Sequence, residues 1–392
     1  MPQEIKIKKG RERRIQGGHL WVFSNEITDS LKRYKAGEIV DIHSYRGEFL
    51  GRGYINPKSL ISIRILTPEK DEIDAEFFHK RILKAWSYRK QIYPDANSYR
   101  VVFGESDFLP GLIVDRYDDY LVVQTLSLGM DIRLNTIADV LTDIFRPVGI
   151  IERNDVAVRK LEGLEEKKGF FRGDKKERIA INEDRLNFEA DILNGQKTGF
   201  FFDQRENRKA VRKYIKQGSR VLDCFCYSGG WTIYAADSGA GEINGLDSSG
   251  DAIKLAERNA EINGFSKICM FKKVDVFDEL RRLVSSCEQY DVIILDPPAF
   301  VKSSGRVREA LKGYKEVNLQ AMKLLRDGGT LITCSCSYHI DRESFRDMLV
   351  QSASDAGRNF RLMEIRGQAF DHPVLLSMKE TEYLKCAVLQ GV

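Results

Sequence analysis

The second half of the chain alternates short apolar segments with longer segments of helical periodicity. Strands that alternate with helices of about 10–15 residues form a parallel sheet with helices on both faces. We therefore expect a doubly wound, Rossmann-like α/β domain over residues 191–392. The expected strands are 220–223, 242–247, 269–274, 290–296, 329–334, 360–365 and 382–388, and the expected helices are 231–238, 252–263, 277–287, 307–325 and 341–356.

The first half of the chain follows a different pattern. Residues 1–70 contain short alternating segments separated by Gly-rich turns, which favours a small β-barrel or sandwich. Residues 71–190 combine helices near 74–92 and 131–145 with several strands, and a charged loop is expected over 159–178. We predict three domains: a β-barrel over 1–70, an α+β domain over 71–190 and the α/β domain.

Length and composition limit the class of protein. A chain of 392 residues is too long for one typical domain, and 42% hydrophobic residues exclude a largely disordered chain. The 62 Lys and Arg against 58 Asp and Glu give a net charge of +4, which neither requires nor excludes nucleic acid. Seven cysteines are too few for a disulfide framework at this length. Without an apolar run of about 18 residues or an apolar signal region, we expect a cytoplasmic protein with no membrane contact.

Acidic residues end several of the expected strands, where ligands of such sheets bind. Asp223 precedes a turn containing Gly229, whose missing Cβ lets a ligand approach the backbone. The carboxylate favours a cationic ligand over a pyrophosphate. Asp247 is placed to bind ribose hydroxyls, or it only caps the next helix. Asp275 could accept from an adenine amino group, although Asp commonly begins a helix.

The most specific local signal is an apolar strand that ends in Asp296-Pro297-Pro298-Ala299-Phe300. The prolines restrict the loop, so we expect Asp296 and Phe300 to face the cleft. A carboxylate beside an aromatic ring suits an amino-bearing base, because the carboxylate accepts its N–H groups and the ring stacks on its face.

Cysteines follow at the end of the next strand. Cys334 and Cys336 are either small buried residues or, at this edge of the sheet, a nucleophile that attacks an electron-poor ring. Structural zinc sites favour C-x₂₋₄-C spacing, whereas this pair and Cys224/Cys226 are C-x-C. We therefore expect no metal.

Basic residues gather near the N-terminus. They form either a solvated strand edge or a patch that contacts phosphate. The residues are Lys6, Lys8, Lys9, Arg11, Arg13 and Arg14.

Together, these motifs resemble a known family. Residues 190–392 resemble class I S-adenosylmethionine-dependent methyltransferases, and the whole chain resembles the large-subunit rRNA methyltransferases that act on carbon 5 of cytosine. Residues 18–24 (GHLWVFS) are similar to the RNA-binding PUA domain of that family and residues 104–115 (GESDFLPGLIVD) to its middle domain. Residues 197–205 (KTGFFFDQR) are similar to the start of its catalytic domain.

The resemblance implies S-adenosylmethionine as cofactor, large-subunit rRNA as partner and a middle domain that links the others or binds RNA. Cys336 matches the nucleophile of the family, and Asp296 would bind the cytosine edge. The residues expected around the cofactor are Gln204, Arg205, Asp223, Phe225, Tyr227, Gly229, Asp247, Asp275, Val276 and Asp296. Those expected to contact RNA are Phe300, Lys6, Arg11, Arg13 and Arg14.

The chemistry of the family implies that the Cys336 thiolate adds to carbon 6 of cytosine, carbon 5 takes the methyl group and a base removes the carbon 5 proton. Better-known RNA relatives carry a second Cys where this chain has Ala299, so that base is unassigned. A base-nitrogen methyltransferase with Cys336 as a bystander, a catalytically silent RNA-binding assembly factor and a nicotinamide dehydrogenase are alternatives. A homodimer is left open.

Overall fold

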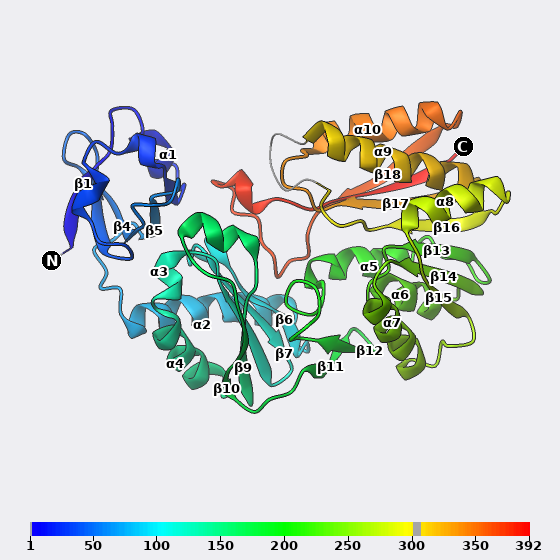
Figure 1. Cartoon of the computed structure of the whole chain (residues 1–392), viewed down its shortest axis with the longest axis horizontal. Helices are drawn as coiled ribbons and strands as arrows, with labels where there is room; N and C mark the ends of the chain where they lie inside the picture. Colours follow the sequence, from blue (N-terminus) through cyan, green and yellow to red (C-terminus); the bar gives the residue numbers. More distant parts are fainter. Residues whose placement is uncertain (1, 301–306) are drawn as a thin grey trace. The chain divides into compact units, whose positions relative to one another are not determined.

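The computed structural model describes residues 2–300 and 307–392, which form two compact units (Figure 1). Unit 1 contains Met1–Ile181, Asp191–Phe202 and Phe370–Thr381. Unit 2 contains Asn182–Ala190, Asp203–Ala369 and Glu382–Val392. The chain therefore leaves and re-enters each unit, and a hairpin of β11 (Arg178–Glu183) and β12 (Leu186–Asp191) lies at the first passage.

Unit 1 begins with a five-stranded sheet in the order β1-β3-β4-β5-β2. β1 runs parallel to β3, and the other neighbours are antiparallel. A bridge between Ile7 and Ile27 joins the segments that follow the two edge strands, so the predicted small barrel is confirmed. The elements are β1 (Gln3–Lys6), α1 (Glu12–Gln16), β2 (Trp21–Val22), η1 (Ser24–Glu26), η2 (Leu31–Arg33), β3 (Ile39–His43), β4 (Phe49–Ile55) and β5 (Ile63–Thr67).

A second sheet of unit 1 has the order β10-β9-β8-β7-β6, in which only β8 and β9 are parallel. Helix α2 begins where the Asp74 side chain accepts a hydrogen bond from the Phe77 N–H (2.9 Å). The elements are α2 (Ala75–Ile92), β6 (Ser98–Phe103), η3 (Gly104–Asp107), β7 (Leu112–Tyr117), β8 (Tyr120–Thr125), α3 (Leu128–Asp131), α4 (Leu134–Phe145), β9 (Gly149–Asn154), η4 (Ala157–Glu162) and β10 (Lys167–Gly173).

The charged loop predicted over 159–178 is wrong in its centre, because β10 lies there. This strand is at the edge of its sheet and has no fully buried residue. An exposed edge strand rich in Lys and Arg lacks the apolar alternation by which a strand is recognised in sequence.

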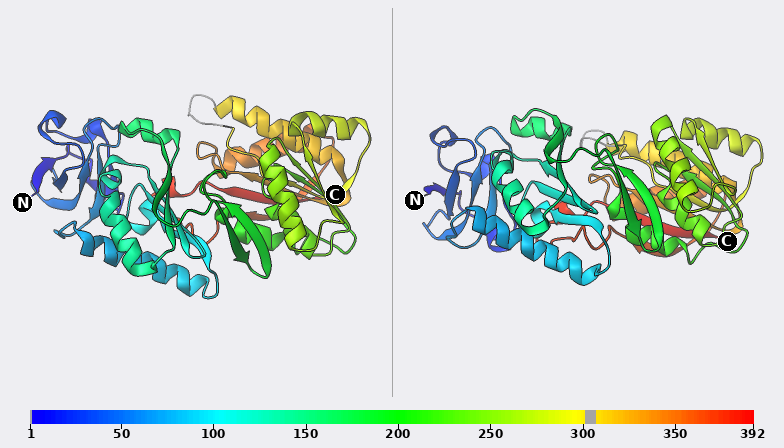
Figure 2. Two further views of the ribbon diagram at one scale, coloured as in Figure 1. Left: turned by 60° about the horizontal axis from the view of Figure 1, so that its bottom comes forward. Right: turned by 90° about the horizontal axis from the view of Figure 1, so that it is seen from below.

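Unit 2 contains a seven-stranded sheet in the order β15-β14-β13-β16-β17-β19-β18. Helices α8, α9 and α10 cover one face and α5, α6 and α7 the other, as Figures 1 and 2 show, which confirms the doubly wound prediction. The strands are β13 (Arg220–Cys224), β14 (Glu242–Asp247), β15 (Cys269–Lys273), β16 (Tyr290–Leu295), β17 (Leu325–Ser335), β18 (Phe360–Arg366) and β19 (Lys385–Gly391). The helices are α5 (Arg205–Val211), α6 (Gly230–Asp237), α7 (Gly250–Ile262), α8 (Val276–Ser285), α9 (Val307–Leu324) and α10 (Arg342–Asp355).

The last strand departs from the parallel pattern. β19 lies between β17 and β18 and is antiparallel to both. The connection from β18 to β19 runs through Phe370–Thr381, which belongs to unit 1, where Met378 is buried in the core of the barrel. None of the described helices is long and apolar enough to cross a membrane.

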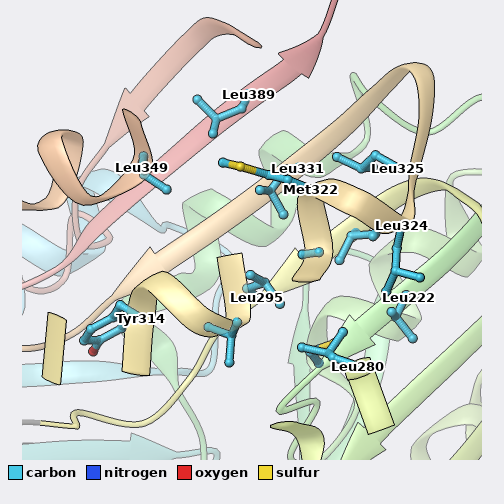
Figure 3. Close-up of a cluster of buried hydrophobic side chains, with 14 of the residues drawn as sticks. Leu222, Leu280, Leu295, Tyr314, Met322, Leu324, Leu325, Leu331, Leu349 and Leu389 are labelled. Atoms are coloured by element: carbon cyan, nitrogen blue, oxygen red, sulfur yellow. The ribbon is translucent and has the colours of Figure 1, made fainter. Parts of the chain in front are cut away.

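Successive side chains along the strands of unit 2 lie on opposite faces of the sheet, so apolar core residues alternate with residues on the other face. Leu222, Leu295 and Leu331 point into one buried cluster with side chains of α8, α9 and α10 (Figure 3). Asp223 therefore faces the other side of the sheet from Leu222.

Removing a core side chain should weaken this unit. Leu331 has no exposed surface, so Leu331→Ala is expected to lower the free energy of unfolding by about 2–5 kcal/mol. Leu362 on β18 is 43% exposed, and Leu362→Ala should cost less than about 1 kcal/mol. Chemical denaturation of both variants measures the difference, and equal losses would contradict this assignment of the core.

Candidate active site

The carboxyl ends of β13, β14 and β16 lie side by side. Asp223 pairs with Gly245 on β14 and with Ile294 on β16. The Asp296 N–H donates to the carbonyl of Cys224 (3.3 Å), so the loop after β16 starts beside the end of β13. Since Asp247 and Asp296 each lie two residues beyond a partner of Asp223, the three carboxylates gather at one edge of the sheet.

Asp223 is a fully buried carboxylate with an incomplete set of partners. Its Oδ2 accepts a hydrogen bond from Thr232 Oγ1 (2.6 Å), and its Oδ1 has no partner among the described residues. Burial raises the pKa of Asp223 to about 7, the Thr232 hydrogen bond opposes the rise and the negative charge of Asp296 adds to it. A carboxylate in these surroundings is stabilised by a bound cation.

The turn between β13 and α6 has a strained backbone. Phe225 (φ 64°), Tyr227 (φ 48°) and Gly229 (φ 79°) are all left-handed. Left-handed non-glycine residues are costly and gather at ligand sites. A Cβ on Gly229 would also lie 3.2 Å from the Cβ of Ala256, so side chains are disfavoured there on two counts.

Asp247 organises this turn. Its Oδ2 accepts from the Tyr227 N–H (3.0 Å) and its Oδ1 from the Ser249 N–H (2.9 Å). The residue that caps α7 is Ser249, which accepts from Ala252, so the alternative that Asp247 is only a helix cap is wrong. Each carboxylate oxygen of Asp247 has a second lone pair for a ligand hydroxyl.

Asp275 caps α8, since its side chain accepts from the Asp278 N–H (3.1 Å). The capping alternative therefore holds for this residue. Val276, the first residue of α8, is buried in the core cluster of unit 2. A role for these two residues toward adenine stays a prediction.

Two donors orient Asp296. Gln204 Nε2 donates to its Oδ1 and Trp231 Nε1 to its Oδ2, both at 2.9 Å. Gln204 is held in turn by Asn207, whose Nδ2 donates to the Gln204 Oε1 (2.7 Å). The structure thus brings together the predicted residues Gln204 and Asp296 and adds Trp231 to them.

Phe300 packs against other aromatic rings in the structure. The sequence predicts that its ring stacks on a base beside Asp296. The structure packs the ring against Tyr314 (4.7 Å between centroids), Phe277 (5.7 Å) and Phe225 (6.4 Å). Gly313 on α9 leaves room for it, since a Cβ there would lie 3.2 Å from the ring. Phe300 therefore lies beside Phe225, and its stacking on a base stays a prediction.

Arg205 also has a structural partner. Its Nε donates to Glu183 Oε2 (3.0 Å), and Arg208 donates to the same carboxylate (2.8 Å). All three side chains are buried. The predicted packing of Arg205 over the cofactor stays a prediction, and its visible contact links α5 to β11.

The two cysteines at the end of β17 differ. Cys334 is fully buried opposite Cys386 of β19, and burial raises the pKa of its thiol. β17 ends at Ser335, so Cys336 lies in the loop beyond it, partly exposed, with Sγ 3.8 Å from the carbonyl oxygen of Pro297. A reactive thiol needs this access, and Cys334 lacks it.

The N-terminal basic residues lie in unit 1 on β1 and around α1. Lys6, Arg11 and Arg13 are exposed. Arg14 is engaged, because its guanidinium donates to Glu26 (2.6 Å) and to the Trp21 carbonyl (3.1 Å). Arg14 thus stabilises the barrel, whereas Lys6, Arg11 and Arg13, like Lys8 and Lys9, are accessible cations.

Sequence reasoning missed Thr232, Trp231 and Lys385. Thr232 and Trp231 open α6 directly after the Gly229 turn, so their place after a ligand-binding turn was a usable signal. Lys385 lies on β19, and nothing in its sequence neighbourhood connects it with Cys336. Within the described ranges, no group of three His, Cys, Asp or Glu residues is arranged to hold a metal.

Comparison with known proteins identifies this arrangement. Residues 164–365 match the family model described as S-adenosylmethionine-dependent methyltransferase, and residues 5–68 match that of a PUA-like domain. The chain belongs to the S-adenosylmethionine-dependent methyltransferase family. This confirms the predicted family, its PUA-like domain and S-adenosylmethionine as the cofactor of the methyltransferase.

Relatives match over their whole length. Proteins named ribosomal RNA large subunit methyltransferase I from Vibrio cholerae and Tolumonas auensis are 39% identical to this methyltransferase over 398 residues, covering 99–100% of the chain and 100% of each relative. A solved structure of a candidate SAM-dependent methyltransferase from Streptococcus mutans has a TM-score of 0.84 at 20% identity, covering 99% of this chain and 100% of that one. A methyltransferase structure complexed with SAH reaches 0.85 at 20% identity.

The residues of unit 2 fit S-adenosylmethionine. The cofactor carries a sulfonium and an ammonium, and the buried Asp223 has an oxygen without a partner and a raised pKa. Asp247 offers acceptors for ribose hydroxyls. The rings of Phe225, Phe277 and Phe300 pack against one another and remain partly exposed, and aromatic surface of this kind suits a planar base.

Asp223 should make cofactor binding pH-dependent. A positive ligand favours the ionised carboxylate, so affinity is expected to rise with pH through about 7 and then level off. Calorimetric titration of S-adenosylmethionine from pH 6 to 8.5 measures this rise. Asp223→Asn should lower affinity by at least about tenfold and flatten the profile, whereas Asp251→Asn, an exposed control on α7, should not.

The same carboxylate should destabilise the free protein at alkaline pH. A pKa raised in the folded state means that stability from this group is present below the unfolded pKa and is lost as pH rises toward about 7. Ligand-free Asp223→Asn is therefore expected to melt at a higher temperature than wild type at pH 8, with a smaller gain at pH 5. A lower melting temperature at pH 8 would contradict the burial argument.

Proposed function

We propose that this methyltransferase modifies carbon 5 of a cytosine in large-subunit rRNA, with Cys336 as the nucleophile. The observation that carries the proposal is the placement of the Cys336 thiol. It is partly exposed at the carboxyl end of β17, one strand from the Asp296 loop, and Sγ lies 3.8 Å from the Pro297 carbonyl. The names of the relatives support rRNA as the substrate.

A thiol is needed because carbon 5 of cytosine is a weak nucleophile. The Cys336 thiolate forms a bond to carbon 6, and the electron pair of the 5,6 double bond moves to carbon 5. When bound, S-adenosylmethionine supplies an electrophilic methyl group. After methylation, a base takes the carbon 5 proton, the double bond re-forms and the thiolate leaves carbon 6.

Asp296 would hold the cytosine. Gln204 and Trp231 occupy one acceptor position on each carboxylate oxygen and fix the plane of the group. A carboxylate held in this plane can accept from the exocyclic amino group of the base. This contact would present carbon 6 to Cys336, and its strength depends on the two donors that orient Asp296.

The deciding test is methyl transfer to unmodified large-subunit rRNA, followed by mass spectrometry of the nucleosides. Wild type should form 5-methylcytidine, and Cys336→Ala should lose at least about a thousandfold of the rate. Cys334→Ala is the matched control and should remain active, because its thiol is buried. A methylated guanosine or adenosine formed by both wild type and Cys336→Ala would establish a base-nitrogen methyltransferase instead.

We also propose that the PUA-like barrel over 1–70 and the middle domain over 71–190 hold the rRNA and that the reaction takes place in the cytoplasm. The exposed cations Lys6, Arg11 and Arg13 support a phosphate contact. Contacts of this kind release counterions, so affinity falls as salt rises.

Replacing two of these cations should change the salt dependence. For the double variant Arg11→Ser/Arg13→Ser, the plot of log K against log salt is expected to become shallower, with the magnitude of its negative slope reduced by about two. Fluorescence anisotropy with an rRNA fragment, at salt concentrations between about 50 and 200 mM, measures this slope. Lys254→Ser on α7 is the control and should leave the slope unchanged. An unchanged slope in the double variant would contradict the proposal that the barrel contacts RNA.

A further inference from the structure

The position of β19 brings a lysine to the end of β17. Lys385 is the first residue of β19 and lies opposite Ser335, which directly precedes Cys336. Lys385 is buried, with an exposed fraction of 4%. A buried lysine beside a candidate nucleophile requires an explanation, because Lys is rarely buried without a partner.

The visible partners of Lys385 are neutral. Its Nζ donates to the carbonyls of Ser337 (2.6 Å) and Tyr383 (2.9 Å), and none of the described carboxylates forms an ion pair with it. Two carbonyls hold the ammonium in place without neutralising its charge. Because a buried charge without a counter-ion is costly, an anion formed nearby would be stabilised.

Cys336 can supply that anion. Among the groups that interact electrostatically with Lys385, the Cys336 thiolate has the largest effect. Burial lowers the pKa of Lys385 to about 8, and Cys336, Glu382 and Asp341 raise it, whereas Arg342 lowers it. On the α9 side, Tyr314 bonds to Ser337 Oγ (2.9 Å) and stays neutral, since burial raises its pKa to about 12.

We propose that Lys385 is the positioning residue that keeps Cys336 as a thiolate for its attack on the substrate base, an inference that rests on the proposed function. Through the Ser337 carbonyl, Lys385 fixes the loop that carries the thiol. Through its charge, it favours loss of the thiol proton to water, and the ammonium keeps its own protons. Lys385 itself does not touch the substrate.

The test follows the thiol directly and needs neither RNA nor cofactor. The full-length protein is alkylated with iodoacetamide from pH 5.5 to 9.5, and the rate at Cys336 is read by mass spectrometry of its peptide. In wild type, the midpoint of the pH–rate profile should lie below the ordinary thiol value of about 8.5. Lys385→Met should raise the midpoint by about one unit or more and slow alkylation at pH 7 about tenfold.

Two variants separate charge from structure. Lys385→Arg keeps the positive charge and should hold the midpoint near that of wild type, whereas Lys385→Gln, which can donate to a carbonyl but carries no charge, should raise it. Lys254→Met on α7 is the matched control and should leave the profile unchanged. An equal midpoint in wild type and Lys385→Met would overturn the proposal.

The experiment distinguishes failure of the Lys385 proposal from a folding defect and from failure of the proposed function. If Lys385→Met does not fold, Lys385→Gln, which can still donate to one carbonyl, takes its place. A wild-type midpoint at or above about 8.5 overturns the proposal without any variant. Loss of 5-methylcytidine as the product would overturn the proposed function, while the alkylation profile would still report whether Lys385 acts on Cys336.

Discussion

The buried carboxylate of Asp223 is the constraint on which the site depends. β13 lies between β14 and β16, and its apolar side chains, Leu222 and Cys224, are buried in the core on one face. The alternation that buries them turns Asp223 toward α6, where only Thr232 donates to it among the described residues. The free protein thus carries a carboxyl group whose ionised form is disfavoured, and a ligand with a positive charge would relieve this.

The loop after β16 connects the two halves of the proposed reaction. Asp296 is oriented by Gln204 and Trp231, while Phe300 packs with Phe225 and Phe277. Between them, the carbonyl of Pro297 lies against the Cys336 thiol. Two adjacent prolines make this segment stiff, so one short piece of chain carries Asp296, contacts the aromatic rings and lies against the Cys336 thiol.

Local sequence signals predicted elements well where the pattern was strong. The helix expected over 307–325 is α9 (Val307–Leu324), and the apolar strand expected over 290–296 is β16 (Tyr290–Leu295). Local signals failed where tertiary packing decides whether a segment forms a strand or which residue caps a helix. The edge strand β10 has no fully buried residue and no regular apolar alternation. The choice between a helix cap and a ligand contact for Asp247 depended on Ser249, which carries the cap instead.

The sequence by itself determined the strand–helix alternation, the carboxylates at the strand ends and the Cys336 motif, because these follow from local periodicity and from residues adjacent in the chain. It also carried the resemblance to S-adenosylmethionine-dependent methyltransferases. Only the tertiary structure decided which distant residues meet. The insertion of β19 between β17 and β18 sets Lys385 beside Cys336, and Phe370–Thr381 joins the barrel unit. Strand order is set by burial and hydrogen bonding over the whole sheet, and no local pattern encodes it.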